Sequence, residues 1–265
     1  MNPAVAAALT EDIGSGDITT LLTIPADAVA TGTVTARQAL TLAGVELLAE
    51  VFPCAVELVR RSGDVLHPGD VIAVVRGPAR DLLTRERTAL NFLQRLSGIA
   101  TLTARYVEAV AGTGCRILDT RKTTPGLRQL EKMAVAAGGG TNHRFGLYDA
   151  VLIKNNHIAA AGGVTAALQR TRRAQVPVEI EVRTREELCE ALNCGATHLL
   201  LDNLTPAGAK EWIDEIAGRA RVELSGGITL DTVRAYAETG ADFVSCGALT
   251  HSAPAVDINF RVELG

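Results

Sequence analysis

The chain has 265 residues, of which 47% are hydrophobic and 21% charged, and its formal net charge is −4. This composition is typical of a packed globular protein and excludes a disordered chain. Aromatic residues make up only 3%, too few for the stacking platforms of single-strand binding, and the acidic charge also argues against nucleic acid as a partner. The scattered cysteines form no disulfide framework, the N-terminus lacks the features of a signal peptide, and no apolar run reaches the ~18 residues of a membrane span. We therefore expect a cytoplasmic protein with no membrane partner.

The first part of the chain predicts a small α/β module. Short elements are expected over residues 3–10 (helix), 31–36 (strand), 44–52 (helix), 55–60 (strand) and 71–76 (strand). A glycine- and acid-rich turn is expected over residues 11–19. Residues 79–111 carry leucines at helical spacing, and Ser97-Gly98 predicts a kink or a break between two helices. We expect this helical block to end the first domain, at residue 111.

From residue 115 onward, strand and helix patterns alternate. Apolar runs occur at 116–118, 150–153, 178–182, 198–201, 222–224 and 242–245. Helical patterns occur at 126–137, 163–174, 185–193, 206–217 and 229–239. This alternation predicts a parallel sheet with crossover helices. The fold class is therefore α/β, with a second domain over residues 112–252 and an alternating tail, 253–265, that returns to the N-terminal sheet.

Polar or glycine-rich residues follow each of these six strands. A barrel brings all its strand ends to one mouth, whereas an open doubly wound sheet uses one switch point. The pattern therefore favours a barrel, although six strands are two fewer than a complete eight-stranded barrel has. We expect an incomplete, about six-stranded α/β barrel.

Cations gather between residues 119 and 157 of this acidic protein. Arg121 and Lys122 follow one strand, Lys154 follows the next, and Arg144 lies in the loop between them. An arginine can hold a carboxylate or phosphate through two parallel hydrogen bonds, and a lysine supplies a point charge. The pattern predicts an anion site; the alternative is a solvated surface with salt bridges.

Two acidic residues, Glu181 and Asp202, end neighbouring strands. A pair of carboxylates beside phosphates suits Mg²⁺, bound directly or through water. The alternative is that both carboxylates pair with the lysines opposite. Ser225-Gly226-Gly227 and Gly247-Ala248 follow the last two strands and could bind phosphate through backbone N–H groups; the alternative for each is a plain turn.

His143 stands beside Arg144, and we expect this cationic neighbour to favour the neutral imidazole. We interpret the ring as a hydrogen-bond donor to an anion rather than as a base. The chain has no Ser-His-Asp arrangement, no P-loop lysine motif and no dinucleotide fingerprint. The residues suit a reaction in which positioning and electrostatics do most of the chemistry.

These residues lie in motifs that resemble the quinolinate phosphoribosyltransferases, the carboxylating nicotinate-nucleotide pyrophosphorylases. The similar segments are Glu86–Asn91, Ser97–Ala100, Asp119–Gly126, Gly138–Arg144, Leu147–Asp149, Leu152–Lys154, Asn156-His157, Ser225–Ile228 and Gly247–Ser252. Glu11-Asp12 and Gly16-Asp17 resemble the N-terminal loop of the family. The resemblance spans nearly the whole chain.

The resemblance implies condensation of quinolinate with 5-phosphoribosyl 1-diphosphate, with loss of pyrophosphate and CO₂, to give nicotinate mononucleotide for NAD synthesis. It implies Mg²⁺ as cofactor and an N-terminal α/β sandwich module followed by an incomplete barrel. It also implies a homodimer or higher homo-oligomer in which the partner's N-terminal module completes each barrel mouth.

The resemblance also implies roles for individual residues. The quinolinate binders are Arg87 from the other subunit, Thr120, Arg121, Lys122, His143 and Arg144. The binders of the phosphoribosyl diphosphate are Lys154, Glu181, Asp202, Ser225, Gly226, Gly227, Cys246, Gly247 and Ala248. We expect Lys122, Glu181 and Asp202 to be catalytic, with Lys122 assisting decarboxylation.

Three positions depart from the pattern of the family. Asn155 stands where an acid is common, Ala136 where a basic residue is frequent, and Cys246 where a small apolar residue is frequent. We expect these departures to tune affinity. The alternatives are a paralogue of the same fold associated with molybdenum transport, a nicotinate phosphoribosyltransferase, and a non-catalytic nucleotide-binding protein.

Overall fold

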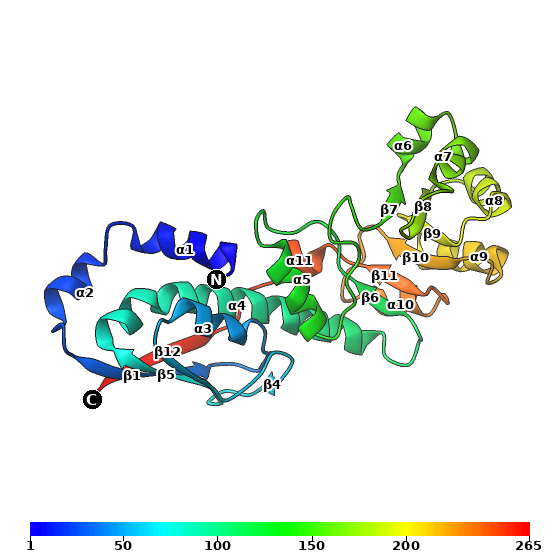
Figure 1. The fold of residues 1–265 in the computed structure, drawn as a ribbon. Helices are drawn as coiled ribbons and strands as arrows, with labels where there is room; N and C mark the ends of the chain where they lie inside the picture. The colour runs from blue at the N-terminus through cyan, green and yellow to red at the C-terminus, as the bar shows by residue number, and fades with distance from the viewer. The chain divides into compact units, whose positions relative to one another are not determined.

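The computed structural model describes residues 1–265 (Figure 1). The chain forms two compact units. The first comprises residues 1–104, 124–139 and 252–265, and the second comprises residues 105–123 and 140–251. The domain limits expected from the sequence, at residues 111 and 252, stay a prediction. No helix is both long enough and apolar enough to cross a membrane.

A four-stranded antiparallel sheet forms the centre of the first unit, in the order β12-β1-β5-β3. Its strands are β1 (Val29–Ala36), β3 (Ala55–Leu58), β5 (Val71–Pro78) and β12 (Ile258–Leu264). The C-terminal strand β12 pairs with β1, so that Val34 lies opposite Phe260. The even-numbered residues of β1 are buried and the threonines between them are half-buried, which is the alternation of a sheet with one face on the core.

The long helix α4 (Ala79–Ala109) is continuous, so the break expected at Ser97-Gly98 was wrong. These two residues instead provide contacts with other segments. Ser97 Oγ accepts a hydrogen bond from the Ala43 N–H at 3.0 Å. A Cβ atom at Gly98 would lie 2.1 Å from the Pro254 carbonyl oxygen, so glycine permits the C-terminal segment to approach the helix.

The remaining elements of the first unit are α1 (Pro3–Ile13), α2 (Ile18–Thr23), β2 (Leu40–Thr41), η1 (Val45–Leu47), α3 (Leu48–Val51), β4 (Val65–Leu66) and α5 (Arg128–Ala137). The helix α2 was not predicted, and it lies partly in the expected acid-rich turn. Asp17 begins this helix, because its Oδ1 accepts the Thr20 N–H at 2.9 Å. The turn itself is therefore short, between Ile13 and Ile18.

The second unit contains a six-stranded parallel sheet in the order β6-β11-β10-β9-β8-β7. Its strands are β6 (Arg116–Leu118), β7 (Val151–Ile153), β8 (Val178–Val182), β9 (His198–Asp202), β10 (Arg221–Ser225) and β11 (Phe243–Ser245). The edge strands β6 and β7 do not pair with each other. The expected incomplete α/β barrel is therefore confirmed.

The helices of this unit are α6 (Asn155–Ala161), α7 (Val164–Thr171), α8 (Arg185–Asn193), α9 (Pro206–Ile216), α10 (Val233–Ala237) and α11 (Ala248–His251). The helix α6 was missed because it begins directly after β7 without a turn signal. The helix expected over residues 229–239 is shorter, since its first residues form a turn in which Thr229 N–H donates to Thr232 Oγ1 at 3.0 Å.

The two faces of this sheet differ in polarity. On one face the side chains are apolar and almost fully buried, namely Ile180, Val182, Leu199, Leu201, Val222 and Leu224. The alternate residues point to the opposite face and include Glu179, Glu181, Asp202, Glu223 and Ser225. Register aligns Glu181 with Leu200 and Leu200 with Glu223. The strands therefore place a group of carboxylates on the inner face of the barrel.

Candidate active site

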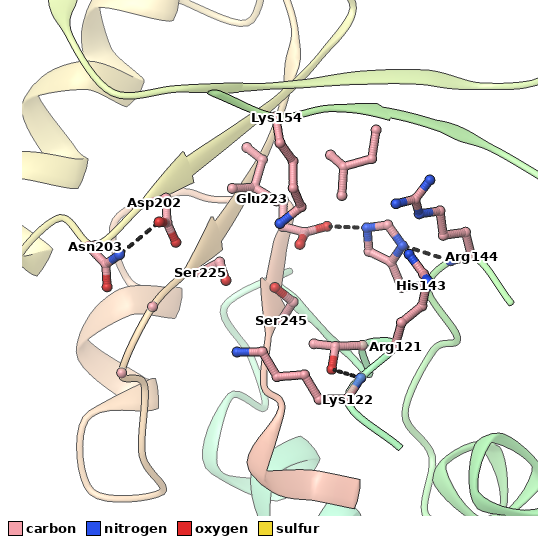
Figure 2. Close-up of a pocket in the computed structure, with 15 residues that line it drawn as sticks. Arg121, Lys122, His143, Arg144, Lys154, Asp202, Asn203, Glu223, Ser225 and Ser245 are labelled. Atoms are coloured by element: carbon pink, nitrogen blue, oxygen red, sulfur yellow. Dashed lines mark hydrogen bonds and ion pairs between the residues drawn. The ribbon is translucent and has the colours of Figure 1, made fainter. Parts of the chain in front are cut away.

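A cavity of about 430 Å³ opens at the C-terminal ends of the strands of the second unit (Figure 2). Ten residues expected from the sequence line it: Thr120, Arg121, Lys122, His143, Arg144, Lys154, Asp202, Ser225, Gly226 and Gly227. The structure thus brings together the cations after β6 and β7 and the polar residues after β9 and β10. This is the end of a barrel at which active sites form.

Two arginines line the same side of this cavity. Burial lowers the pKa of Arg144, and the positive charge of Arg121 lowers it further. The Nη1 group of Arg144 donates to the Ala150 carbonyl oxygen at 3.0 Å, which fixes the direction of the side chain. An anion bound between the guanidinium groups would relieve their repulsion and accept hydrogen bonds from them. The arrangement therefore suits a ligand with carboxylate or phosphate groups.

Lys122 lies on the loop after β6, and its backbone is held at both ends. Its N–H donates to Thr120 Oγ1 at 3.0 Å, and its carbonyl oxygen accepts from Thr250 Oγ1 at 2.8 Å. Gly247 lies close to its side chain, because a Cβ atom there would stand 2.8 Å from Lys122 Cδ. The exposed ammonium group is thus carried on a fixed backbone at the cavity.

Glu181 binds cations and is not among the residues that line the cavity. Its Oε2 lies 3.5 Å from Lys154 Nζ, and its Oε1 lies 2.9 Å from Arg183 Nη2. The carboxylate is almost fully buried, whereas Lys154 is exposed at the cavity. Glu181 therefore contacts the cavity through Lys154, as in the alternative considered for it.

Asp202 lines the cavity at the end of β9. Its Oδ2 accepts a hydrogen bond from Asn203 Nδ2 at 2.7 Å. Opposite them, Gly226 has a φ of +103°, and a Cβ atom there would lie 2.3 Å from Asn203 Oδ1. Glycine is required at this position on both counts. The loop after β10 can therefore approach Asp202 closely enough to share one ligand.

His143 contacts two carboxylates on the inner face of the barrel. Its Nε2 lies 3.1 Å from Glu179 Oε2 and 3.3 Å from Glu223 Oε2. On the other side of the ring, the Arg144 N–H donates to Nδ1 at 2.7 Å. The His143 N–H donates to the Asp119 carboxylate at 2.8 Å. His143 thus connects its own loop to strands β8 and β10 and to Asp119, which follows β6.

These contacts correct the expectation for His143. Burial lowers its pKa, but hydrogen bonds and charges from Glu179 and Glu223 outweigh burial and raise it to about 10. The expectation that cationic neighbours would govern the ring was wrong, because its nearest charged groups are carboxylates. Burial also raises the pKa of Glu179. The carboxylates thus favour the imidazolium, whereas the Arg144 N–H, which can only donate, opposes a second ring proton. We follow this geometry, in which Nδ1 is an acceptor and the ring hydrogen lies on Nε2. A second ring proton would break the contact with Arg144.

The other expected site residues lie outside the cavity lining. Burial raises the pKa of the Cys246 thiol to about 12, and its N–H donates to the Leu118 carbonyl oxygen at 3.0 Å. Gly247 and Ala248 form the junction between β11 and α11. Arg87 is an exposed residue of α4 in the first unit. None of these four residues is among those that line the cavity.

Five residues that line the cavity were not anticipated: Leu152, Leu200, Asn203, Glu223 and Ser245. The signal for Glu223 was its position within the apolar run of β10, where an unpaired carboxylate is costly. The signal for Ser245 was its place at the end of β11. Asn203 follows Asp202 and has a positive φ of 59°, a conformation that could not be predicted from the sequence.

Two groups of residues could hold a metal ion. Asp202 offers one carboxylate at the cavity, which with water and phosphate oxygens suits Mg²⁺. His143, Glu179 and Glu223 have ligand atoms within 4.8 Å of one another. In this second group, the contacts of His143 Nε2 with the two carboxylates already explain why these atoms lie close together without a metal ion.

Comparisons with known proteins show which family the chain resembles. Residues 17–97 match the N-terminal domain and residues 99–261 the C-terminal domain of quinolinate phosphoribosyl transferase. The chain is 44% identical over 262 residues to the probable nicotinate-nucleotide pyrophosphorylase (carboxylating) of Bacillus subtilis, covering 96% of this chain and 90% of that protein. It is 44% identical over 271 residues to the Mycobacterium leprae protein of that name, covering 95% and 93%. The crystal structure of NadC from Streptococcus pyogenes superposes with a TM-score of 0.94 at 40% identity, covering 99% and 96%.

Proposed function

This chain belongs to the quinolinate phosphoribosyltransferase family, and we infer that the cavity at the strand ends of its second unit is the active site. The protein is a carboxylating nicotinate-nucleotide pyrophosphorylase, a transferase of NAD biosynthesis. It joins quinolinate to the phosphoribosyl group of 5-phosphoribosyl 1-diphosphate and releases pyrophosphate and CO₂. The alternatives considered from the sequence are not favoured. The observation that best supports the site is that Arg121 and Arg144 both line the cavity, close enough for the charge of one to lower the pKa of the other.

We assign the cationic wall of the cavity to quinolinate. Two arginines match the two carboxylates of quinolinate, with Lys122, His143 and Thr120 beside them. The quinolinate nitrogen attacks C1 of the ribose while the bond to pyrophosphate breaks. The C2–carboxylate bond then breaks, its electron pair remains on C2 beside the positive ring nitrogen, and a proton replaces CO₂. Lys122 would stabilise the negative charge that develops during this step.

We assign the opposite wall of the cavity to 5-phosphoribosyl 1-diphosphate. Lys154 offers a positive charge, and Ser225, Gly226 and Gly227 offer hydroxyl and backbone donors for a phosphate. Glu181 would hold Lys154 toward this substrate through their 3.5 Å ion pair. The turn formed by Cys246, Gly247 and Ala248 lies against the Lys122 side chain at Gly247 and supplies no charged group.

Mg²⁺ is the proposed cofactor. Asp202 fits this ion, because its carboxylate lines the cavity that would hold the diphosphate, and such an ion uses one or two carboxylates plus phosphate oxygens. Glu181 fits less well as a direct ligand, since both its oxygens are within ion-pair distance of cations. When bound, the ion would neutralise the charge that develops on the leaving pyrophosphate.

We further propose a homodimer with shared active sites, located in the cytoplasm. Arg87 is exposed on α4 and would reach the quinolinate site of a partner subunit. Exposed apolar side chains on each unit, such as Leu22 on α2 and Tyr148 on the loop before β7, offer surface for such an interface.

All five cysteines are free thiols, as expected in a reducing compartment.

One assay tests the function. The protein is incubated with quinolinate, 5-phosphoribosyl 1-diphosphate and Mg²⁺, and nicotinate mononucleotide and CO₂ are measured. Product should form from quinolinate and not from nicotinate, and chelation of the metal should abolish it. Lys122→Ala should lose most turnover; wild-type turnover in this variant would exclude Lys122 from the chemistry. Thermal stabilisation by quinolinate without turnover would indicate a binding protein.

Complementation tests the shared site. Arg87→Ala and Lys122→Ala are each expected to be inactive alone. After unfolding and refolding together, mixed dimers should contain one intact site, which would restore roughly a quarter of wild-type activity. No recovery, although mixed dimers form, would show that Arg87 does not act in the site of the partner.

A further inference from the structure

Glu223 is a buried acid in the middle of β10, and its side chain is only 4% exposed. A carboxylate at such a position is costly unless it is paired. Its partner is the Nε2 group of His143, at 3.3 Å, and Glu179 of β8 contacts the same nitrogen at 3.1 Å. Figure 2 shows the Glu223 carboxylate pointing at the His143 ring.

The other edge of the ring contacts the backbone of Arg144, whose N–H donates to Nδ1 at 2.7 Å. Because this donor occupies Nδ1, the hydrogen of the ring must lie on Nε2, where the two carboxylates accept it. The carboxylates thus determine both the tautomer and the orientation of the ring. A ring turned the other way could not accept the Arg144 N–H.

The orientation of the ring in turn fixes the position of Arg144 at the cavity. Its backbone N–H is held by His143 Nδ1, and its Nη1 group is held by the Ala150 carbonyl oxygen at 3.0 Å. The guanidinium is therefore restrained at both ends of the residue. Since a bidentate contact to a carboxylate depends on the direction of the guanidinium plane, a shift of the Arg144 backbone would weaken it.

We propose that Glu223, together with Glu179, is a positioning residue for quinolinate: it holds His143, and through His143 it orients Arg144 toward the substrate carboxylate. This inference rests on the proposed function of the cavity, and it adds two residues on strands β8 and β10 that do not themselves bind the substrate. The effect passes through hydrogen bonds, so it requires an acceptor at residue 223 rather than a negative charge.

The test compares Glu223→Leu with Glu223→Gln. Leu removes one of the two acceptors, so that Glu179 alone holds the Nε2 hydrogen. It should raise the KM for quinolinate about tenfold or more, with the KM for 5-phosphoribosyl 1-diphosphate unchanged within about twofold. Gln keeps an acceptor oxygen and should stay within about threefold of wild type. Glu211→Leu, on the exposed surface of α9, is the matched control and should change neither constant.

A double variant shows whether Glu223 acts through the ring. In a His143→Ala background, Glu223→Leu should add no further increase in the KM for quinolinate, because the link to Arg144 is already lost. The inference is overturned if the two effects multiply, if both substrates are weakened equally, or if Gln behaves like Leu. If Glu223→Leu does not fold, Glu179→Leu is measured against the same expectations.

Calorimetric titration of quinolinate separates this inference from the proposed function. If the wild-type protein binds quinolinate but makes no product, the proposed function fails, and the dissociation constants of the variants still test the role of Glu223. If the wild-type protein makes product and all variants bind quinolinate equally, only the inference about Glu223 fails.

Discussion

The Lys154 ammonium lies 3.5 Å from Oε2 of Glu181, a carboxylate whose other oxygen binds Arg183 at 2.9 Å. Lys154 begins the segment after β7, and Glu181 lies on the neighbouring strand β8. The pair thus joins two neighbouring strand ends beside the cavity. An almost fully buried carboxylate between two cations keeps one of them, Lys154, directed at the cavity.

Glu181→Gln should therefore raise the KM for 5-phosphoribosyl 1-diphosphate more than the KM for quinolinate. The amide cannot balance Lys154 and Arg183, and the free energy of unfolding should also fall by about 1–3 kcal/mol. Steady-state kinetics with each substrate varied, and urea unfolding, measure the two effects. Glu108→Gln, on the exposed face of α4, is the control. Equal weakening of both substrates would contradict the assignment.

Arg144→Lys keeps a positive charge but loses the planar pair of donors. We expect the KM for quinolinate to rise at least about tenfold, which corresponds to a loss of about 1.4 kcal/mol in binding. Arg173→Lys, at an exposed position after α7, is the matched control and should leave both KM values unchanged. A variant with wild-type affinity for quinolinate would show that Arg144 makes no bidentate contact with the substrate.

Gly98→Ala tests the contact between α4 and the C-terminal segment. Alanine in a helix is usually more stable than glycine, but here the Cβ atom would lie 2.1 Å from the Pro254 carbonyl oxygen. We expect the free energy of unfolding to fall by about 1–3 kcal/mol, as for other overpacked sites. Gly208→Ala in α9, where the nearest atom is 3.4 Å away, should be neutral or slightly stabilising. The urea midpoints of both variants measure these effects. We expect the midpoint to fall for Gly98→Ala and to stay the same or rise for Gly208→Ala.

Asp17→Asn tests the cap of α2 through its pH dependence. Hydrogen bonds from Thr20 lower the pKa of Asp17 in the folded protein below its usual 3.8. A carboxylate with a lowered pKa adds stability above the unfolded value, and this stability is lost as the pH falls through the folded value. Wild type should therefore be more stable than the variant at neutral pH, and the difference should shrink as the pH falls below 3.8. Urea midpoints across this range measure it, with Asp27→Asn as control for loss of an exposed carboxylate.

Much of the site could be predicted from the sequence because its cations follow directly after strands. Arg121, Lys122 and Lys154 each lie within a few residues of a recognisable apolar run, and a barrel gathers such positions at one mouth. Gly226 could also be identified, because a glycine pair after a strand predicts a backbone that approaches a ligand. Local periodicity and residue type were sufficient for these predictions.

The partners of His143 could not be predicted in this way. Its ring contacts Glu179 and Glu223, which lie on β8 and β10 with β9 between them. Alternation shows that each glutamate faces the opposite side from its apolar neighbours, but it does not show which residue lies across the barrel. The same limit applies to Ser97-Gly98, which suggested a break locally although its role is to accommodate distant segments.

The sequence by itself determined the α/β class, the six strands, the cationic character of the site and the resemblance to the family, because these depend on residue type and short-range periodicity. Only the tertiary structure decided which charges meet. It paired Glu181 with Lys154, and it turned His143 toward two carboxylates, since the order and register of the strands set these distances.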